Sequence, residues 1–148
     1  MLYNVNDIAN KIILQTDIEK GDIISNLKLQ KLLYYMQGYH LAFFGERLFE
    51  DKLEAWMYGP VVPGVYHRFK DNGSFGISLD TATYKEIELT PEEEDMFAQV
   101  MREYGKFSAI RLMEMTHDET PWKEAFESKE RVINVDTMKT FFTKLIDA

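Results

Sequence analysis

Apolar residues recur at intervals of three and four in six segments of the chain, and this spacing predicts a mostly α-helical protein. Such a stripe is typical of a helix that buries one face and leaves the other in water. The six expected helices lie within residues 5–16, 27–46, 63–69, 90–107, 108–117 and 135–148.

The segment 27–46, LKLQKLLYYMQGYHLAFFGE, carries more aromatic side chains than one exposed helix needs. Its expected inner face consists of Leu29, Leu32, Leu33, Met36 and Phe43. Tyr34 and Tyr39 flank this face, where a tyrosine ring either packs against a neighbouring element or contacts another protein. Gly38 indicates that another backbone or a bulky ring lies against the helix, because glycine is otherwise unfavourable in a helix interior.

Residues 46–69 predict a small β-hairpin followed by a helix. The short apolar runs RLF and LEAWMY are separated by EDK, which suits two paired strands. The prolines of YGPVVP then favour extended or turning backbone. Pro63 suits the first turn of the next helix, where its missing N–H is not needed.

Capping residues mark several helix ends and turns. Ser25 or Asn26 is the expected N-cap of the 27–46 helix, and Gly45 is its expected C-terminal end. Thr90 and Pro91, followed by four acidic residues that we expect to be solvated, predict another helix start. Turns are expected at residues 19–22 and 70–76 and at DETPW. In the 108–117 helix, Ile110 is expected on the inward face.

Length and composition indicate one soluble domain. The chain has 148 residues, of which 45% are apolar and 28% charged, and no boundary or low-complexity segment interrupts it. The expected fold is a mostly α, compact single-domain helical bundle of about six helices with a small two-stranded β-hairpin, spanning residues 1–148. No apolar run approaches the length of a membrane span, and a cytoplasmic location is expected.

The distribution of charge argues against independent binding to nucleic acid. The net charge is -8, and the acidic excess lies mostly in the second half of the chain. A protein that grips DNA or RNA by itself normally presents a basic face to the phosphates. An acidic surface instead favours encounter with a basic protein partner.

Signals for catalysis are weak. The chain has no cysteine, and its three histidines do not occur at the spacing that places two metal ligands on one helix face. No nucleophile elbow or phosphate-binding glycine loop is present. The strongest local cluster is His117, Asp118 and Glu119, which is either a polar connector between helices or the site of a small metal-dependent hydrolase. We expect no catalytic residues, no metal and no cofactor.

Three sequence blocks resemble one known family. KLQKLLYYMQGYHLAF (28–43), EAWMYGPVVPGVYHRF (54–69) and MTHDETPWKEAF (115–126) are together similar to the Panacea antitoxin domain, which includes SocA-like and phage-associated GepA-like proteins. The resemblance implies a mostly helical module that neutralises a cognate toxin, encoded by an adjacent gene, by direct binding. It also implies two possible modes, a stoichiometric blocker or an adaptor that hands the toxin to a protease.

The resemblance and the aromatic pattern together give a set of candidate residues. The expected partner-binding rim consists of Lys28, Lys31, Tyr35, Tyr39, Trp56 and Tyr58. The expected structural motif consists of Gly59, Pro60, Pro63, His117, Pro121 and Trp122. Internal packing of the same aromatic rings is the competing interpretation, and a phage protein that binds a host regulator is a further functional alternative.

Overall fold

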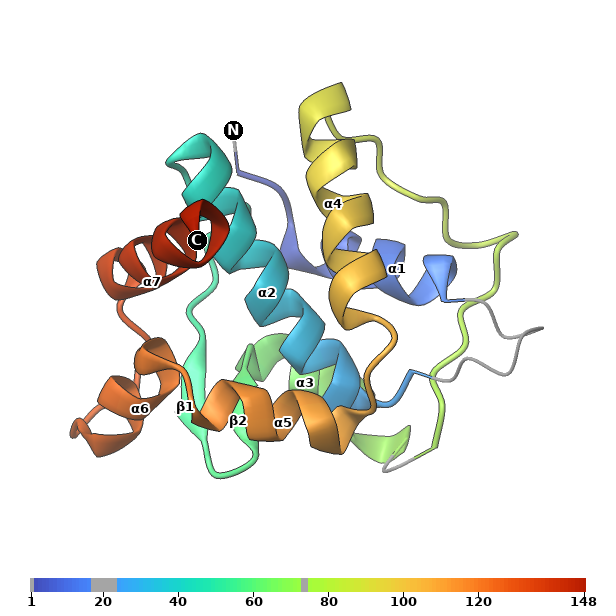
Figure 1. Cartoon of the computed structure of the whole chain (residues 1–148). Helices are drawn as coiled ribbons and strands as arrows, with labels where there is room; N and C mark the ends of the chain where they lie inside the picture. Colours follow the sequence, from blue (N-terminus) through green and yellow to red (C-terminus); the bar gives the residue numbers. More distant parts are fainter. Residues whose placement is uncertain (1, 17–23, 73–74) are drawn as a thin grey trace.

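The computed structural model describes residues 2–16, 24–72 and 75–148. Within these ranges the chain forms seven α-helices, a short 3-10 turn and one two-stranded antiparallel sheet (Figure 1). The elements are α1 (Val5–Gln15), α2 (Asn26–Phe44), β1 (Glu54–Trp56), β2 (Gly59–Val61), α3 (Pro63–Phe69), η2 (Lys70–Asn72), α4 (Pro91–Tyr104), α5 (Ala109–His117), α6 (Thr120–Glu127) and α7 (Val135–Asp147). The predicted mostly helical fold with a small hairpin is confirmed, with one helix more than expected.

Two expected turns fall on or beside undescribed residues. The turn at 19–22 lies outside the described residues, and the turn at 70–76 includes two residues that are not described. None of the helices in the described ranges combines the length and apolar character needed to cross a bilayer.

Helix α2 lies at the centre of the fold, and the other elements pack around it (Figure 1). Every residue from 29 to 41 is buried, so this part of the helix has no solvated face. The expectation of a single inner face is therefore wrong, since polar residues such as Lys31 and Gln37 are buried as well, whereas Phe43 is 43% exposed. Tyr34 and Tyr39 are buried, which agrees with the interpretation that their rings pack against neighbouring elements. Periodicity marks the apolar side chains but cannot show that the polar ones between them are also enclosed.

The polar side chains of α2 are buried because each finds a partner inside the protein. Gln37 accepts hydrogen bonds from the backbone N–H groups of Leu48 and Phe49, at 2.7 and 3.3 Å, and donates to the Phe49 carbonyl at 2.9 Å. Gln30 accepts from the Val62 N–H at 2.9 Å and donates to Asn26 at 2.9 Å. A buried amide without such partners would be costly, so these bonds fix irregular segments against the helix.

The hairpin forms between other residues than those expected. Strand β1 pairs with β2 in antiparallel register, with Glu54 opposite Val61 and Trp56 opposite Gly59. The predicted pairing of residues 47–49 is wrong, because Phe49 instead forms an isolated parallel bridge with Tyr3. Gly59 has a φ of 108°, a conformation that favours glycine, and this lets the chain turn after only two residues.

A third segment completes the small sheet on the other side of β1. Glu54 also forms an antiparallel bridge with Val132. The Ala55 N–H donates to the Arg131 carbonyl at 2.7 Å, and the Ile133 N–H donates to the Leu53 carbonyl at 2.8 Å. The outer edge of β1 is thus held by a segment distant in sequence.

Helix α6 occupies the position where a turn was expected. Pro121 lies in its first turn, where proline fits without loss of a hydrogen bond. Thr120 and Pro121, which fall within the predicted turn, instead begin this helix. The predicted helix starts at Ser25 and Thr90 are confirmed, as is the end at Gly45, which has a φ of 74°.

Gly38 permits the closest approach between α2 and α7. A Cβ atom added at Gly38 would overlap the ring of Phe142, which is itself fully buried. The expectation that a bulky ring lies against Gly38 is confirmed. Phe142 also forms edge contacts with the rings of Tyr34 and Tyr35, at centroid distances of 5.4 and 5.9 Å.

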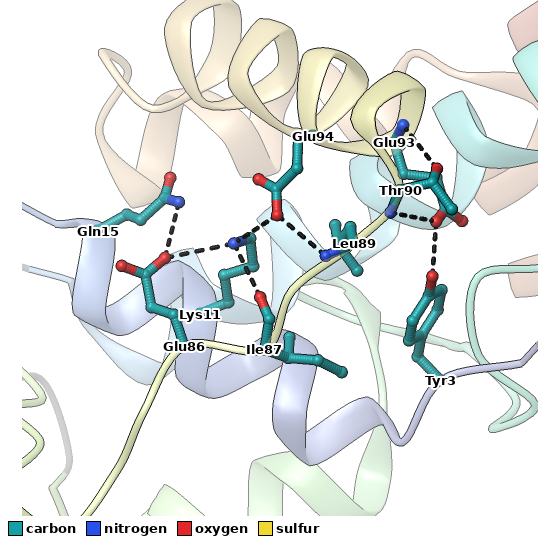
Figure 2. A network of polar contacts seen from close by, with 9 residues as sticks. All are labelled: Tyr3, Lys11, Gln15, Glu86, Ile87, Leu89, Thr90, Glu93 and Glu94. Atoms are coloured by element: carbon teal, nitrogen blue, oxygen red, sulfur yellow. Dashed lines mark hydrogen bonds and ion pairs between the residues drawn. The ribbon is translucent and has the colours of Figure 1, made fainter.

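Lys11 joins α1 to the segment that precedes α4 (Figure 2). Its buried ammonium group lies 3.3 Å from Glu86 and 3.1 Å from Glu94 and donates to the Ile87 carbonyl at 3.1 Å. Gln15 donates to the same Glu86 carboxylate at 2.8 Å. These contacts satisfy a buried charge and hold a long irregular segment against the core.

The acidic start of α4 is only partly solvated. Glu93 is 7% exposed, contrary to the expectation for this run, and forms a capping box with Thr90. Tyr3 donates to one of its oxygens at 2.6 Å, and the Nε2 of His40 lies 2.6 Å from the other. Burial opposes the ionised form, but the hydrogen bonds from Tyr3, His40 and Thr90 outweigh it and lower the pKa of Glu93 to about 2.

Lys11→Met is expected to lower the free energy of unfolding by about 2 kcal/mol, because it removes a buried charge-assisted cluster and leaves the Ile87 carbonyl without its donor. Urea denaturation at pH 7.5 measures the change. Lys129→Met is the matched control, since Lys129 is exposed. Equal stability of the two variants would contradict the role of the cluster.

Candidate partner-binding site

The structure separates the residues that were expected to form one outward rim. Lys31 and Tyr35 have no exposed surface, and Tyr39 is 4% exposed, so their expected position at the surface is wrong. Lys28 is partly exposed, and its ammonium group donates to the Gly105 carbonyl at 2.6 Å. Tyr58, by contrast, is 62% exposed. The six residues therefore do not share one surface.

The tyrosines of α2 are buried because two carboxylates receive their hydroxyl groups. Tyr34 and Tyr35 donate to the two oxygens of Glu119, each at 2.9 Å. The ring of Tyr35 stacks on Tyr104 with centroids 3.9 Å apart. Tyr39 lies within hydrogen-bond distance of both the Tyr104 hydroxyl and Glu103. These rings join α2 to α4 and to the corner between α5 and α6.

Glu119 sits in an environment that disfavours its charge. Burial raises its pKa from 4.5 to about 7, although the hydrogen bonds from Tyr35 and Tyr34 act in the opposite direction. Asp118 next to it contributes a further rise. The carboxyl group therefore holds a proton in the folded protein at pH values where it is ionised in an unfolded chain.

The cluster of His117, Asp118 and Glu119 does not converge on one site. Glu119 turns inward to the tyrosines, whereas His117 stacks on Trp122 with centroids 4.1 Å apart. Across the described part of the chain, no three histidine or acidic side chains come together in a way that could hold a metal ion. The geometry gives no support to a site built from these three residues.

Trp122 instead positions the hairpin. Its indole Nε1–H donates to the Trp56 carbonyl at 2.9 Å, and its ring stacks on Phe126 with centroids 4.6 Å apart. The indole of Trp56 in turn donates to Glu54 at 3.0 Å and packs edge-on against Tyr66. Trp56 is thus held at both its backbone and its ring.

Lys31 of α2 contacts the hairpin at β2. Its ammonium group donates to the Pro60 carbonyl at 3.0 Å, and no carboxylate in the described ranges forms a salt bridge with it. Burial lowers the pKa of Lys31 from 10.5 to about 7. A Cβ atom at Gly59 would lie 2.5 Å from the Lys31 stem and 3.0 Å from Thr116. Gly59 is therefore required by the close approach as well as by its φ.

The exposed tip of the hairpin borders an apolar groove. The tip consists of Met57 and Tyr58, which are 65% and 62% exposed. The groove has a volume of about 370 Å³. Its apolar and aromatic lining consists of Leu27, Trp56, Tyr58, Val61, Tyr66 and Ile110. We call these six residues together with Met57 the hairpin groove.

The hairpin groove combines residues that were predicted with residues that were missed. Trp56 and Tyr58 were expected in a partner site, whereas Ile110 was expected to point inward and is 57% exposed. A similarly sized hollow between α6 and α7 is lined mainly by polar residues such as Glu124, Asp136 and Lys144. Exposed large apolar side chains grouped around a groove are typical of a protein-binding surface, so the hairpin groove is the stronger candidate.

Comparison with known proteins identifies the class. The family model described as "Antitoxin SocA-like, Panacea domain" matches residues 29–123, which is more than half of the chain. This protein belongs to that antitoxin family. The matched region contains most of α2, the hairpin, the hairpin groove except for Leu27, and the Glu119 corner.

One curated relative is Antitoxin SocA of Caulobacter vibrioides (strain NA1000 / CB15N). It is 36% identical over 110 residues, which cover 67% of this chain and 58% of the relative. The match therefore spans less than two thirds of the relative's length. No solved structure matches the chain.

Proposed function

We propose that this protein neutralises a cognate toxin by direct protein–protein contact, without covalent chemistry. Membership of an antitoxin family supports a toxin as the partner. The observation that favours direct contact is the hairpin groove, where large apolar side chains stand exposed on a tightly held hairpin. Pre-ordered apolar surface binds with little loss of conformational entropy.

Residues 1–148 are proposed to act as one domain. The buried apolar residues form one continuous cluster to which all seven described helices contribute. Removal of any helix would therefore expose part of the same core.

The proposal is tested by co-expression with the product of the adjacent gene. We expect the wild-type chain to restore growth to cells that produce this toxin and to co-purify with it. Failure of both, with the protein folded by circular dichroism, would overturn the proposal. A partner that is a host regulator and has no toxicity would favour the phage-protein alternative.

The hydrolase alternative is tested with two variants in the same assay. We expect His117→Ala and Glu119→Gln to neutralise the toxin as well as wild type, because neither side chain lies in the hairpin groove. Their melting temperatures are measured in parallel, since His117 stacks on Trp122 and Glu119 accepts a hydrogen bond from the buried Tyr34. Loss of neutralisation by both folded variants, with metal bound to the wild-type protein, would support hydrolase chemistry instead.

The amount of toxin in the cell separates the two modes of neutralisation. A stoichiometric blocker leaves the level of toxin unchanged, whereas an adaptor for a protease lowers it. Immunoblots of tagged toxin after induction of the antitoxin measure this level, in a wild-type strain and in strains that lack individual proteases.

A further inference from the structure

We propose, on the basis of the proposed function, that the hairpin groove receives a bulky apolar side chain of the toxin whose neighbouring carboxylate pairs with Lys70. Lys70 also lines the groove and is exposed. The occupant is thus a toxin segment in which an apolar residue adjoins an acidic one.

We infer that the bound toxin side chain is apolar because the polar groups that line the groove are already engaged. Besides Lys70, these are Asn26 and Gln30. Asn26 donates to the Tyr66 carbonyl at 3.0 Å and accepts from Gln30, which itself accepts from the Val62 N–H. Both amides are therefore engaged within the protein. What the groove offers to a ligand is mostly apolar surface, and an apolar side chain is the group that gains most from entering it.

We infer that the neighbouring toxin group is acidic from the charges that line the groove. The whole chain carries a net charge of -8, yet the lining of the groove includes no carboxylate, and its single charged member is Lys70. Lys70 has no salt bridge among the described residues. A carboxylate beside the apolar anchor would pair with this ammonium group, whereas a basic segment would meet it as a like charge. The preference at this groove is thus opposite to that of the acidic protein as a whole.

The groove is formed before any partner binds. The Trp56 carbonyl is held by Trp122, the Pro60 carbonyl by Lys31, and Val62 by Gln30. The ring of Trp56 packs against Tyr66 with centroids 5.0 Å apart. Because these bonds fix both strands and the walls of the groove, exposure of the tip does not depend on a rearrangement.

The experiment measures the affinity of the purified adjacent-gene product for variants of the full chain, by calorimetry at 50 and 300 mM salt. Tyr58→Ala and Ile110→Glu are expected to weaken binding at least about tenfold, as for residues at the centre of an interface. Lys70→Glu is expected to weaken it several-fold, mainly at low salt. Leu145→Glu and Lys129→Glu are the matched controls, since both residues are exposed outside the groove, and wild-type affinity is expected for them.

The outcomes distinguish a failure of the proposed docking site from a failure of the proposed antitoxin function. If the wild-type chain neutralises the toxin but Tyr58→Ala and Ile110→Glu bind as wild type, the groove is not the docking site and the antitoxin function stands. If those two variants lose affinity but Lys70→Glu binds equally well or more tightly, the neighbouring toxin group is not acidic and that part is overturned. If the wild-type chain does not bind the adjacent-gene product, the proposed function itself fails. Melting curves establish that each variant is folded.

Discussion

The free energy of unfolding of this protein is expected to pass through a minimum near pH 7, where most proteins are close to their most stable. The acid side of the minimum comes from Glu119, whose pKa rises from 4.5 to about 7 because of burial. The folded state binds this proton more tightly than the unfolded state, so stability decreases as the pH rises from 4.5 to 7. The full pKa difference of Glu119 corresponds to about 3 kcal/mol in the free energy of unfolding.

The alkaline side comes from Lys31, whose pKa falls from 10.5 to about 7 because of burial. Between these values the unfolded chain holds a proton that the folded protein has lost, so stability increases as the pH rises. The full pKa difference of Lys31 corresponds to about 5 kcal/mol in the free energy of unfolding. The two pH windows meet near 7 and do not overlap, which produces the minimum.

Two variants test which residue causes the acid side and which the alkaline side of the stability minimum. Glu119→Gln is expected to remove the dependence below pH 7, and Lys31→Met the dependence above it. Lys31→Met is also expected to raise stability by roughly 2 kcal/mol at pH 6, because the cost of the buried charge exceeds that of leaving the Pro60 carbonyl without its donor. At pH 9.5 the same variant should be less stable than wild type by roughly 1 kcal/mol, because the wild type gains about 3 kcal/mol between the two pH values as Lys31 loses its proton.

Urea denaturation followed by far-ultraviolet circular dichroism between pH 5 and 9.5 tests this profile. The window avoids Glu93, which changes charge only in acid, and the buried tyrosines, whose raised pKa values matter above pH 10. A stability maximum near pH 7 in the wild type, or a Lys31→Met variant less stable at pH 6, would refute the assignment.

Gly38→Ala is expected to lower the free energy of unfolding by about 3 kcal/mol, although alanine normally favours a helix by about 1 kcal/mol. The new methyl group would overlap the Phe142 ring, and the closely packed surroundings of α2 and α7 leave that ring little room to move. The measurement is urea denaturation at pH 7.5, beside Gly64→Ala as a control where a Cβ atom meets nothing within 4 Å.

A double-mutant cycle identifies the cause of the loss. Phe142→Leu alone is expected to cost about 1–2 kcal/mol because it leaves a small cavity. Combined with Gly38→Ala it should cost much less than the sum, since the smaller side chain makes room for the methyl group. Additive effects would show that the two residues do not clash in this way.

The elements of the fold were largely predictable from local signals. The caps at Ser25 and Thr90 and the glycine at 45 define helix ends through contacts within a few residues, and the structure confirms all three. The hairpin was predicted, but with the wrong partner strand, because the position of Gly59 in β2 depends on the close approach of Lys31 and Thr116 from distant elements.

The candidate site was predictable only in part for the same reason. Tyr58 and Trp56 were expected at a partner site because aromatic residues beside Gly and Pro in a short extended segment are informative without tertiary context. Both line the hairpin groove, and their contact with a partner stays a prediction. Tyr35 and Lys31 could not be placed, since their burial depends on Glu119 and Pro60, which lie 84 and 29 residues away. Ile110 shows the converse error, because helical spacing alone does not reveal which face of a short helix lies beside a groove.

The bridge between Glu54 and Val132 links the middle of the chain to a position near its end. During synthesis on the ribosome, the strand that carries the exposed tip therefore lacks one neighbour until residue 133 has emerged. Phe142, which fills the space beside Gly38, arrives later still. The nascent chain therefore completes the packing around the hairpin and α2 only when translation is nearly finished.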